Sequence, residues 1–98
     1  MKNFKQLKIW QKGFDIATQA FTLTGTFPKE ERFALTSQIT RAAVSIPSNI
    51  AEGSSRSTTR DYGRFLELSL VSSYELETHL LIAQAVNYGE EKVRTKLL

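Results

Sequence analysis

The stretch that decides the fold runs from residue 38 to residue 53 and reads Gln38-Ile39-Thr40-Arg41-Ala42-Ala43-Val44-Ser45-Ile46-Pro47-Ser48-Asn49-Ile50-Ala51-Glu52-Gly53. Its apolar residues recur at steps of three and four, as they do on one face of an α-helix. Pro47 interrupts this helix near its end, and a proline inside a helix costs about 3 kcal/mol because it removes an amide donor and crowds the preceding turn. We therefore expect a helix in which close packing at Ala42 and Ala43, or the polar groups of Asn49 and Glu52, offsets that cost.

Length and composition limit the chain to one small domain. The 98 residues include 13 Lys and Arg against 10 Asp and Glu, no cysteine and one histidine. A chain of this size builds a single core, so we expect one domain over residues 1–98. The lack of cysteine excludes disulfides and thiolate metal sites, and charges interrupt every apolar run, so we expect neither a signal peptide nor a membrane span. We predict a cytoplasmic protein whose net charge of +3 tolerates an anionic partner.

Helical patterns cover the chain, no strand pattern is found, and the predicted fold class is all-α. The first helix is expected over residues 4–24, where Gly25 ends it, with a core seam of Leu7, Trp10, Phe14, Ala17 and Phe21. The second is expected to restart near Pro28 and to end at Gly53, with a core stripe of Leu35, Ile39, Ala42, Ile46 and Ile50.

Two more helices are expected in the last third of the chain. Thr58, with Asp61 three residues later, is an N-terminal capping signal for a third helix over about residues 59–86. Its core seam is predicted to hold Tyr62, Leu66, Ser69, Ser73, Leu76, Leu80 and Ala83. The run Asn87-Tyr88-Gly89 breaks this helix, and a short fourth helix follows over residues 90–98.

The first and third helices carry more apolar surface than one core needs. Ile9, Ile16 and Leu23 form a second stripe on the first helix, about 130° from its predicted core seam. The third helix is apolar nearly all round, which is typical of a helix that has neighbours on several sides. Such faces are covered either by another helix of the same chain or by a second copy, and Ile9, Ile16 and Leu23 are the candidate oligomer interface.

Several segments resemble one known family. They are Phe33-Ala34-Leu35-Thr36-Ser37-Gln38, Arg41-Ala42-Ala43, Ser45 to Gly53, Phe65-Leu66, and Ser72-Ser73 with Glu75-Leu76-Glu77. Together they resemble the four-helix-bundle proteins encoded in intervening sequences of bacterial 23S ribosomal RNA genes, a family akin to the accessory variability determinant of diversity-generating retroelements. The resemblance implies an antiparallel up-and-down four-helix bundle, here with a short fourth helix, that assembles into a pentameric ring. It also implies binding to RNA or DNA and, in the retroelement relatives, contact with a reverse transcriptase.

Basic residues suggest where a nucleic acid would bind. Arg56, Arg60 and Arg64 are spaced by four, and Lys2, Lys5, Lys8 and Lys12 crowd the amino terminus. A ring would multiply these residues into a belt suited to phosphates. The alternative is a solvated face on which Asp61 and Glu67 pair with the arginines. We find no closely spaced aromatic residues for base stacking and no base-reading motif.

The family motif also singles out Arg41, Pro47, Asn49, Glu52 and Gly53. The structural interpretation is that Arg41, Asn49 and Glu52 satisfy backbone groups freed by Pro47. The functional alternative is an anion site built from Arg41 and the amides near Gly53.

Catalysis has little support in the sequence. His79 is the sole histidine and stands alone in the third helix, so a surface or interface histidine is favoured over a member of a nucleophile triad. One histidine without cysteine cannot supply a zinc site, and no glycine-rich phosphate loop is present. We therefore predict a protein that is not an enzyme and that needs no cofactor or metal. The expected function is a self-associating bundle that binds nucleic acid. The alternative is a structural scaffold whose protein partner docks on Ile9, Ile16 and Leu23.

Overall fold

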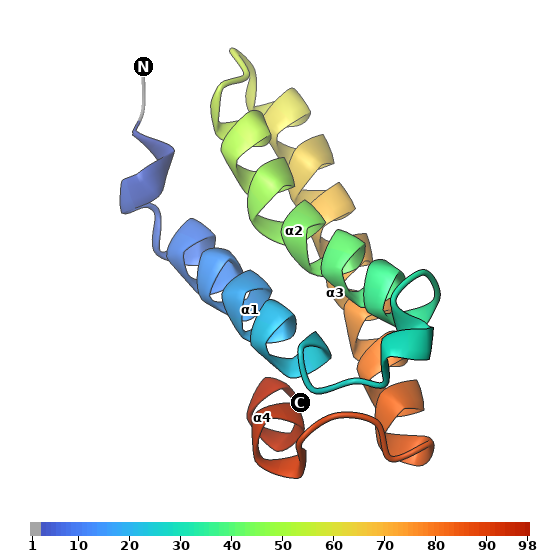
Figure 1. Ribbon diagram of the computed structural model, residues 1–98. Helices are drawn as coiled ribbons and strands as arrows, with labels where there is room; N and C mark the ends of the chain where they lie inside the picture. Colours follow the sequence, from blue (N-terminus) through green and yellow to red (C-terminus); the bar gives the residue numbers. More distant parts are fainter. Residues whose placement is uncertain (1–2) are drawn as a thin grey trace.

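The fold was analysed in a computed structural model that describes residues 3–98 and consists of helices (Figure 1). The α-helices are α1 (Lys8–Thr24), α2 (Leu35–Ser54), α3 (Thr59–Ala85) and α4 (Glu91–Leu97), and two short 3-10 helices are η1 (Phe4–Gln6) and η2 (Lys29–Glu31). The molecule is 43 Å long and 20 Å across. Within residues 3–98 there is no strand, which confirms the all-α prediction.

The helices run up and down in turn, and each packs against its neighbours in the chain. Figure 1 shows α1, α2 and α3 side by side along the length of the molecule, with the short α4 at one end. α2 contacts α1 on one side and α3 on the other, and α4 bridges α3 and α1. This is the expected antiparallel four-helix bundle with a short fourth helix. α4 is seven residues long and covers the side of the bundle between α1 and α3 only at that end.

The helix boundaries differ from the prediction at two starts. The first helix does not run unbroken from Phe4, since Leu7 is extended between η1 and α1. The second helix does not continue from Pro28, because η2 ends at Glu31 and α2 begins only at Leu35. The third and fourth helices lie close to the predicted ranges.

The core is built from one face of each long helix. Its fully buried large side chains are Leu23, Ile39, Ile50 and Leu80. The predicted stripe of α2 is confirmed for Ile39, Ala42, Ile46 and Ile50, while Leu35 is half-buried. On α3, Ser69, Leu76, Leu80 and Ala83 are buried as predicted, and the hydroxyl of Ser69 donates a hydrogen bond to the Ile46 carbonyl at 3.0 Å.

The face of α1 that meets α2 differs from the predicted seam. Phe14 and Phe21 were expected in the core, yet they are 52% and 54% exposed. The rest of the seam is confirmed, since Ala17 is buried and Leu7 and Trp10 pack against the core. α2 meets α1 along Ala17 and along Gly13 and Ala20, two small residues outside the predicted seam. A β-carbon on Gly13 would lie 3.2 Å from Ile46 Cγ2 and 3.4 Å from Pro47 Cα, so the two helices approach most closely there. Pro47 is therefore buried against a glycine, and its ring belongs to the packing between α1 and α2.

Leu23 corrects the predicted oligomer interface. It was grouped with Ile9 and Ile16 as a surface for another subunit, but its side chain is 0% exposed in the core of its own chain. The turn before α4 covers this end of α1, since a β-carbon on Gly89 would lie 2.7 Å from Leu23 Cδ1. Ile16 is half-buried against the core, and Ile9, farther from α4, is 52% exposed.

The ends of α3 follow the predicted signals. The Asp61 amide donates to the Thr58 hydroxyl at 3.1 Å, which caps the amino terminus of the helix. At the other end Asn87 has a φ of 58°, the Tyr88 amide donates to the Ala83 carbonyl, and the Asn87 amide donates to the Gln84 carbonyl. This is a Schellman motif, which stops the helix and turns the chain toward α4.

Hydrogen bonds hold α4 against the end of the bundle. The Glu90 amide donates to the hydroxyl of Thr26, in the turn after α1, at 3.0 Å. Arg94 is 5% exposed, and its guanidinium donates to the Tyr88 carbonyl at 2.8 Å. Tyr88 in turn lies beside Phe27, with ring centroids 5.9 Å apart.

Candidate interaction surfaces

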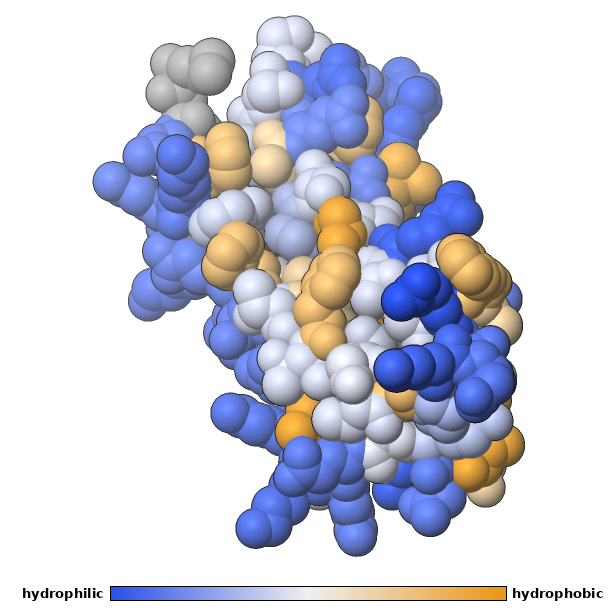
Figure 2. Space-filling model, viewed as in Figure 1, coloured by the Kyte–Doolittle hydropathy of each residue, from blue (hydrophilic) through white to orange (hydrophobic). Residues whose placement is uncertain are grey.

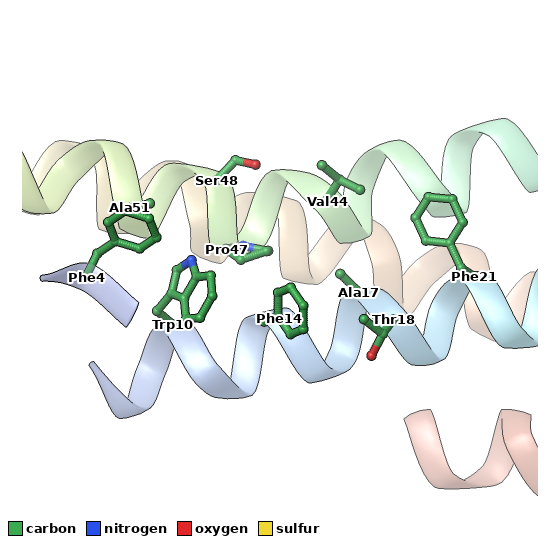
Figure 3. Close-up of a pocket in the computed structure, with 10 residues that line it drawn as sticks. All are labelled: Phe4, Trp10, Phe14, Ala17, Thr18, Phe21, Val44, Pro47, Ser48 and Ala51. Atoms are coloured by element: carbon green, nitrogen blue, oxygen red, sulfur yellow. The ribbon is translucent and has the colours of Figure 1, made fainter. Parts of the chain in front are cut away.

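An apolar groove of about 430 Å³ runs between α1 and α2 on one face of the molecule. Figure 3 shows aromatic side chains of α1 and η1 along one wall and side chains of α2 along the other. Its lining, which defines the α1/α2 groove, is Phe4, Trp10, Phe14, Ala17, Thr18, Phe21, Val44, Pro47, Ser48 and Ala51. In Figure 2 apolar side chains line this face between polar margins.

Three aromatic rings of this groove are in contact, which the sequence analysis missed. The rings of Phe4 and Trp10 meet edge to face at 5.3 Å, and those of Trp10 and Phe14 stack at 5.2 Å. The spacing of four between Trp10 and Phe14 could have indicated the stacked pair, because residues four apart lie on the same helix face. The cluster itself was not expected, whereas the absence of a platform for base stacking stays a prediction, because these rings contact one another within the chain.

A second apolar groove, of about 370 Å³, lies between α1 and α3 on the side that α4 leaves uncovered. Its floor includes Ile46 and Ile50 of α2. Its lining, which defines the α1/α3 groove, is Ile9, Lys12, Gly13, Ile16, Ile46, Ile50, Leu66, Ser69, Leu70 and Ser73. Ile9 and Ile16, two of the three predicted interface residues, thus face one open surface, whereas Leu23 does not.

A third apolar surface lies on the outside of α3. Its side chains are separated by three, eleven and four residues, so they share one helix face that lies outside the α1/α3 groove. They are Leu68 (47% exposed), Val71 (62%), Ile82 (46%) and Val86 (51%), and they define the α3 ridge. The exposed Glu75 lies on the same face between Val71 and Ile82. α3 is therefore apolar on several sides, as predicted.

The predicted nucleic-acid-binding residues gather at one end of the bundle on two helices. Because α1 and α3 both start at the end opposite α4 (Figure 1), that end carries Lys5, Lys8, Lys12, Arg56, Arg60 and Arg64. All six side chains are exposed, and Lys2 lies outside the described residues. The backbones of α1 and α3 do not approach each other closely, so the lysines at the start of α1 and the arginines at the start of α3 form two separate groups.

Arg56 differs from the other basic residues because its charge is engaged within the chain. Its guanidinium lies 3.1 Å from Glu52 Oε1 and 4.6 Å from the centroid of the Phe65 ring. This is the only ion pair among the described residues, so neither Asp61 nor Glu67 pairs with Arg60 or Arg64. Arg60 and Arg64 present free guanidinium groups on the surface.

The polar residues of the family motif do not converge on Pro47. The Asn49 amide donates to the Ser45 carbonyl and hydroxyl at 2.8 and 2.9 Å, and Glu52 pairs with Arg56. Arg41 is exposed and lines a shallow hollow with Phe21 and Val44. The prediction that these three residues satisfy the backbone groups freed by Pro47 was therefore wrong. Because α2 is 20 residues long, Arg41 also lies far from Gly53, so the two do not form one anion site.

Chemistry-bearing side chains are sparse in the described part of the chain. Within residues 3–98 no group of three or more His, Cys, Asp or Glu side chains is arranged to hold a metal ion. His79 lies half-buried on α3. The pKa of Tyr88 is raised, chiefly by the negative charge of Glu31, whose carboxylate accepts a hydrogen bond from the Tyr88 hydroxyl at 3.4 Å. Among the described helices, none combines the length and apolarity needed to cross a bilayer.

The sequence matches one family model from residue 5 to residue 98, and that model is described as 23S rRNA-intervening sequence protein. No curated protein matches the sequence. The match covers nearly the whole chain and includes all four helices of the bundle. The chain belongs to the 23S rRNA-intervening sequence protein family.

Proposed function

We propose that this protein is a non-enzymatic helical bundle that self-associates into a ring and binds RNA or DNA through basic residues at one end. The family resemblance implies five copies in the ring. The cytoplasm is the proposed location, because the sequence lacks cysteine.

The exposed apolar surface of the single chain is the observation that carries the proposal of self-association. Large apolar side chains that are 43% to 62% exposed occur in both the α1/α2 groove and the α3 ridge, for example Phe14, Val44 and Val71. Contiguous apolar patches on a small domain mark interaction sites, because water excluded from them contributes about 25 cal/mol for each Å² buried. Several such faces on one short bundle favour an assembly in which each copy has more than one neighbour.

Nucleic-acid binding is supported by the clustering of charge at the end opposite α4. Lys8, Lys12, Arg60 and Arg64 are exposed there and have no ion pair among the described residues. A ring would repeat both groups, the lysines and the arginines, once per copy, and the repeated charges would face a phosphate backbone together. The described helices place no motif for reading bases at this end, so we propose binding to the backbone.

The alternative function is a scaffold that binds a protein partner and no nucleic acid. The α1/α3 groove favours it, since this groove exposes Ile9 and Leu70 and has the shape that takes an amphipathic helix. A reverse transcriptase is one partner that the resemblance to the retroelement proteins suggests.

The proposal is tested by measuring mass and nucleic-acid affinity on the same preparation. Light scattering should give several times the chain mass of 11.1 kDa. A labelled RNA and a labelled DNA of equal length, titrated at several salt concentrations, should bind with an affinity that falls steeply with salt, by a slope of about 0.9 for each phosphate contact.

Matched charge variants locate the binding surface. Lys8→Ala, Arg60→Ala and Arg64→Ala together should weaken binding and reduce the salt slope. Lys29→Ala, Lys92→Ala and Lys96→Ala remove the same charge at the α4 end and should leave both nearly unchanged. Oligomers that bind neither RNA nor DNA at low salt would favour the scaffold, and equal losses in the two triple variants would refute a site at the end opposite α4.

A further inference from the structure

We infer that the α3 ridge of one copy packs into the α1/α2 groove of the next copy, so that copies join head to tail. This inference rests on the proposed self-association and assigns the two surfaces that make it. It goes beyond the family match, which gives no interface residues.

The two surfaces fit each other in form and lie on different parts of the chain. The α1/α2 groove is a trough between two helices, and the α3 ridge is the convex side of one helix. α2 separates them, because it contacts α1 on one side and α3 on the other. A copy therefore cannot fill its own groove with its own ridge, but it can offer both surfaces at once. Contacts of this heterologous kind close into rings when the rotation between copies allows it.

Contacts within the bundle also place the two surfaces at the same level along its length. Gly13 of α1 lies against Ile46 of α2, and the Ile46 carbonyl accepts a hydrogen bond from Ser69 of α3. Phe14 in the groove and Val71 on the ridge follow Gly13 and Ser69 by one and two residues, so both lie within about 3 Å of that level. A ring whose axis runs along the helices allows no axial shift between neighbours, and surfaces that must meet have to share a level.

A pair of opposite charges lies at matching levels too. Ser45 and Ser72 are hydrogen-bonded at 2.8 Å across α2 and α3. Arg41 lies four residues before Ser45, and Glu75 lies three residues after Ser72. Because α2 and α3 are antiparallel, both are displaced in the same direction from this contact, by about 6 Å and about 4.5 Å.

Arg41 and Glu75 also lie where they can form an ion pair between two neighbouring copies. Arg41 lies at the edge of the groove beside Phe21 and Val44, and Glu75 lies on the α3 ridge between Val71 and Ile82. Both are exposed, and neither takes part in an ion pair within residues 3–98. Opposite charges placed at the edge of an apolar contact fix its register and disfavour other pairings.

The head-to-tail arrangement is tested with one variant on each surface. Val44→Glu blocks the groove and Val71→Glu blocks the ridge, and both residues are exposed enough for the fold to survive. Each variant alone should sediment as a monomer with unchanged helicity. An equimolar mixture should form a dimer of one copy of each, because the ridge of the first variant still fits the groove of the second. Phe33→Glu, at a side chain that is 89% exposed and lies outside both surfaces, should keep the wild-type mass.

Charge reversal tests the register. Arg41→Glu and Glu75→Arg should each weaken the assembly by tenfold or more in the concentration at half-dissociation, and the double variant should recover most of that loss. Failure of the double variant to recover any of the loss would overturn the pairing of these two residues.

The outcomes separate this inference from the proposal on which it depends. A wild-type chain that is monomeric at all accessible concentrations would contradict self-association itself. A wild-type oligomer that survives both Val44→Glu and Val71→Glu but dissociates with Leu70→Glu would place the interface in the α1/α3 groove and overturn only the present inference. Loss of assembly in both variants with no dimer in the mixture would show that the ridge does not fill the groove, which would also overturn it.

Discussion

Gly53 of α2 lies so close to Phe65 of α3 that a β-carbon on the glycine would come within 2.7 Å of the Phe65 Cβ. The sequence suggested that Gly53 ends its helix, but α2 continues to Ser54 and Gly53 has no left-handed φ. The glycine is instead a buried contact point at which the backbone of α2 packs against the side chains of Phe65 and Tyr62 on α3. The Arg56 guanidinium lies over the Phe65 ring, 4.6 Å from its centroid.

Gly53→Ala should therefore destabilise the protein although alanine is the better helix former. The overlap with the Phe65 Cβ, which belongs to the rigid base of that side chain, forces α3 to shift, and overpacking of this kind costs about 1–3 kcal/mol. Gly63→Ala is the matched control, since a β-carbon on Gly63 meets nothing within 4 Å. That change should raise the free energy of unfolding by about 0.5–1 kcal/mol through helix propensity. Denaturant unfolding measures both, and a Gly53→Ala protein as stable as the wild type would refute the close contact.

Local signals in the sequence predicted much of the fold because they depend on few neighbours. The hydroxyl of Thr58 caps α3 in the way that its spacing to Asp61 indicates, and Asn87 ends the same helix. The apolar stripe of α2 was also predicted, since this helix is covered on both sides and its buried face simply follows the helical period.

The buried face of α1 was predicted only in part, since Ala17 is buried as expected but Phe14 and Phe21 are not. Apolar periodicity selects the largest side chains, but the closest approach between helices occurs where side chains are smallest. Gly13 and Ala17 let α2 approach, and Phe14 and Phe21 are left outside as the wall of a groove. Leu23 was assigned to an interface because its cover, the turn at Gly89, is 66 residues away in the sequence.

The residues of the candidate sites also fall into those that local sequence predicts and those whose surroundings depend on distant parts of the chain. The spacing of Arg56, Arg60 and Arg64 predicted residues at one helix start, and the up-and-down topology brings the lysines of α1 to the same end. The environment of Arg41 depends on Phe21 of another helix, so it required the structure.

Because of Tyr88, the free energy of unfolding should vary with pH in the alkaline range. Its pKa is raised above the ordinary 10.0, first by the charge of Glu31, then by burial and by the hydrogen bond to the same carboxylate. Between the two pKa values the unfolded chain has released this proton and the folded chain still holds it. The contribution of protonated Tyr88 to the free energy of unfolding is thus fully present below pH 10.0 and is lost as pH rises through the pKa of Tyr88 in the folded protein.

Glu31→Gln removes the main cause of the raised pKa of Tyr88 and should return this pKa toward its ordinary value. The alkaline decrease in the free energy of unfolding should then be smaller than in the wild type. NMR of carbon-labelled tyrosine rings follows Tyr88 separately from Tyr62 and Tyr74. Glu30→Gln is the control, because Glu30 is the weakest of the contributors and should shift the pKa less. Equal titration curves for wild type and Glu31→Gln would contradict the contact between Glu31 and Tyr88.

The attachment of α4 should depend on Gly89 more than on any other residue of the preceding turn. Gly89 has a φ of +86°, which an L side chain adopts only with strain, and a β-carbon there would lie 2.7 Å from both Leu23 Cδ1 and Phe27 Cε1. Gly89→Ala should therefore push the turn away from the end of α1. Because α4 has only seven residues and docks through this turn, the damage should remain local.

Amide hydrogen exchange distinguishes local detachment of α4 from global destabilisation. In Gly89→Ala the amides of residues 94–98, which are the hydrogen-bonded amides of α4, should exchange at least tenfold faster. The slowest amides of α2 and α3 should change far less, because the core at Ile39, Ile50 and Leu80 lies in other helices. Asn87→Gly is the matched control in the same turn, since Asn87 has a φ of 58° that glycine adopts freely, and α4 should keep its protection. If Gly89→Ala accelerated exchange equally in all four helices, α4 would be part of the cooperative core, and the short fourth helix would close the bundle by more than its few contacts with α1 and α3.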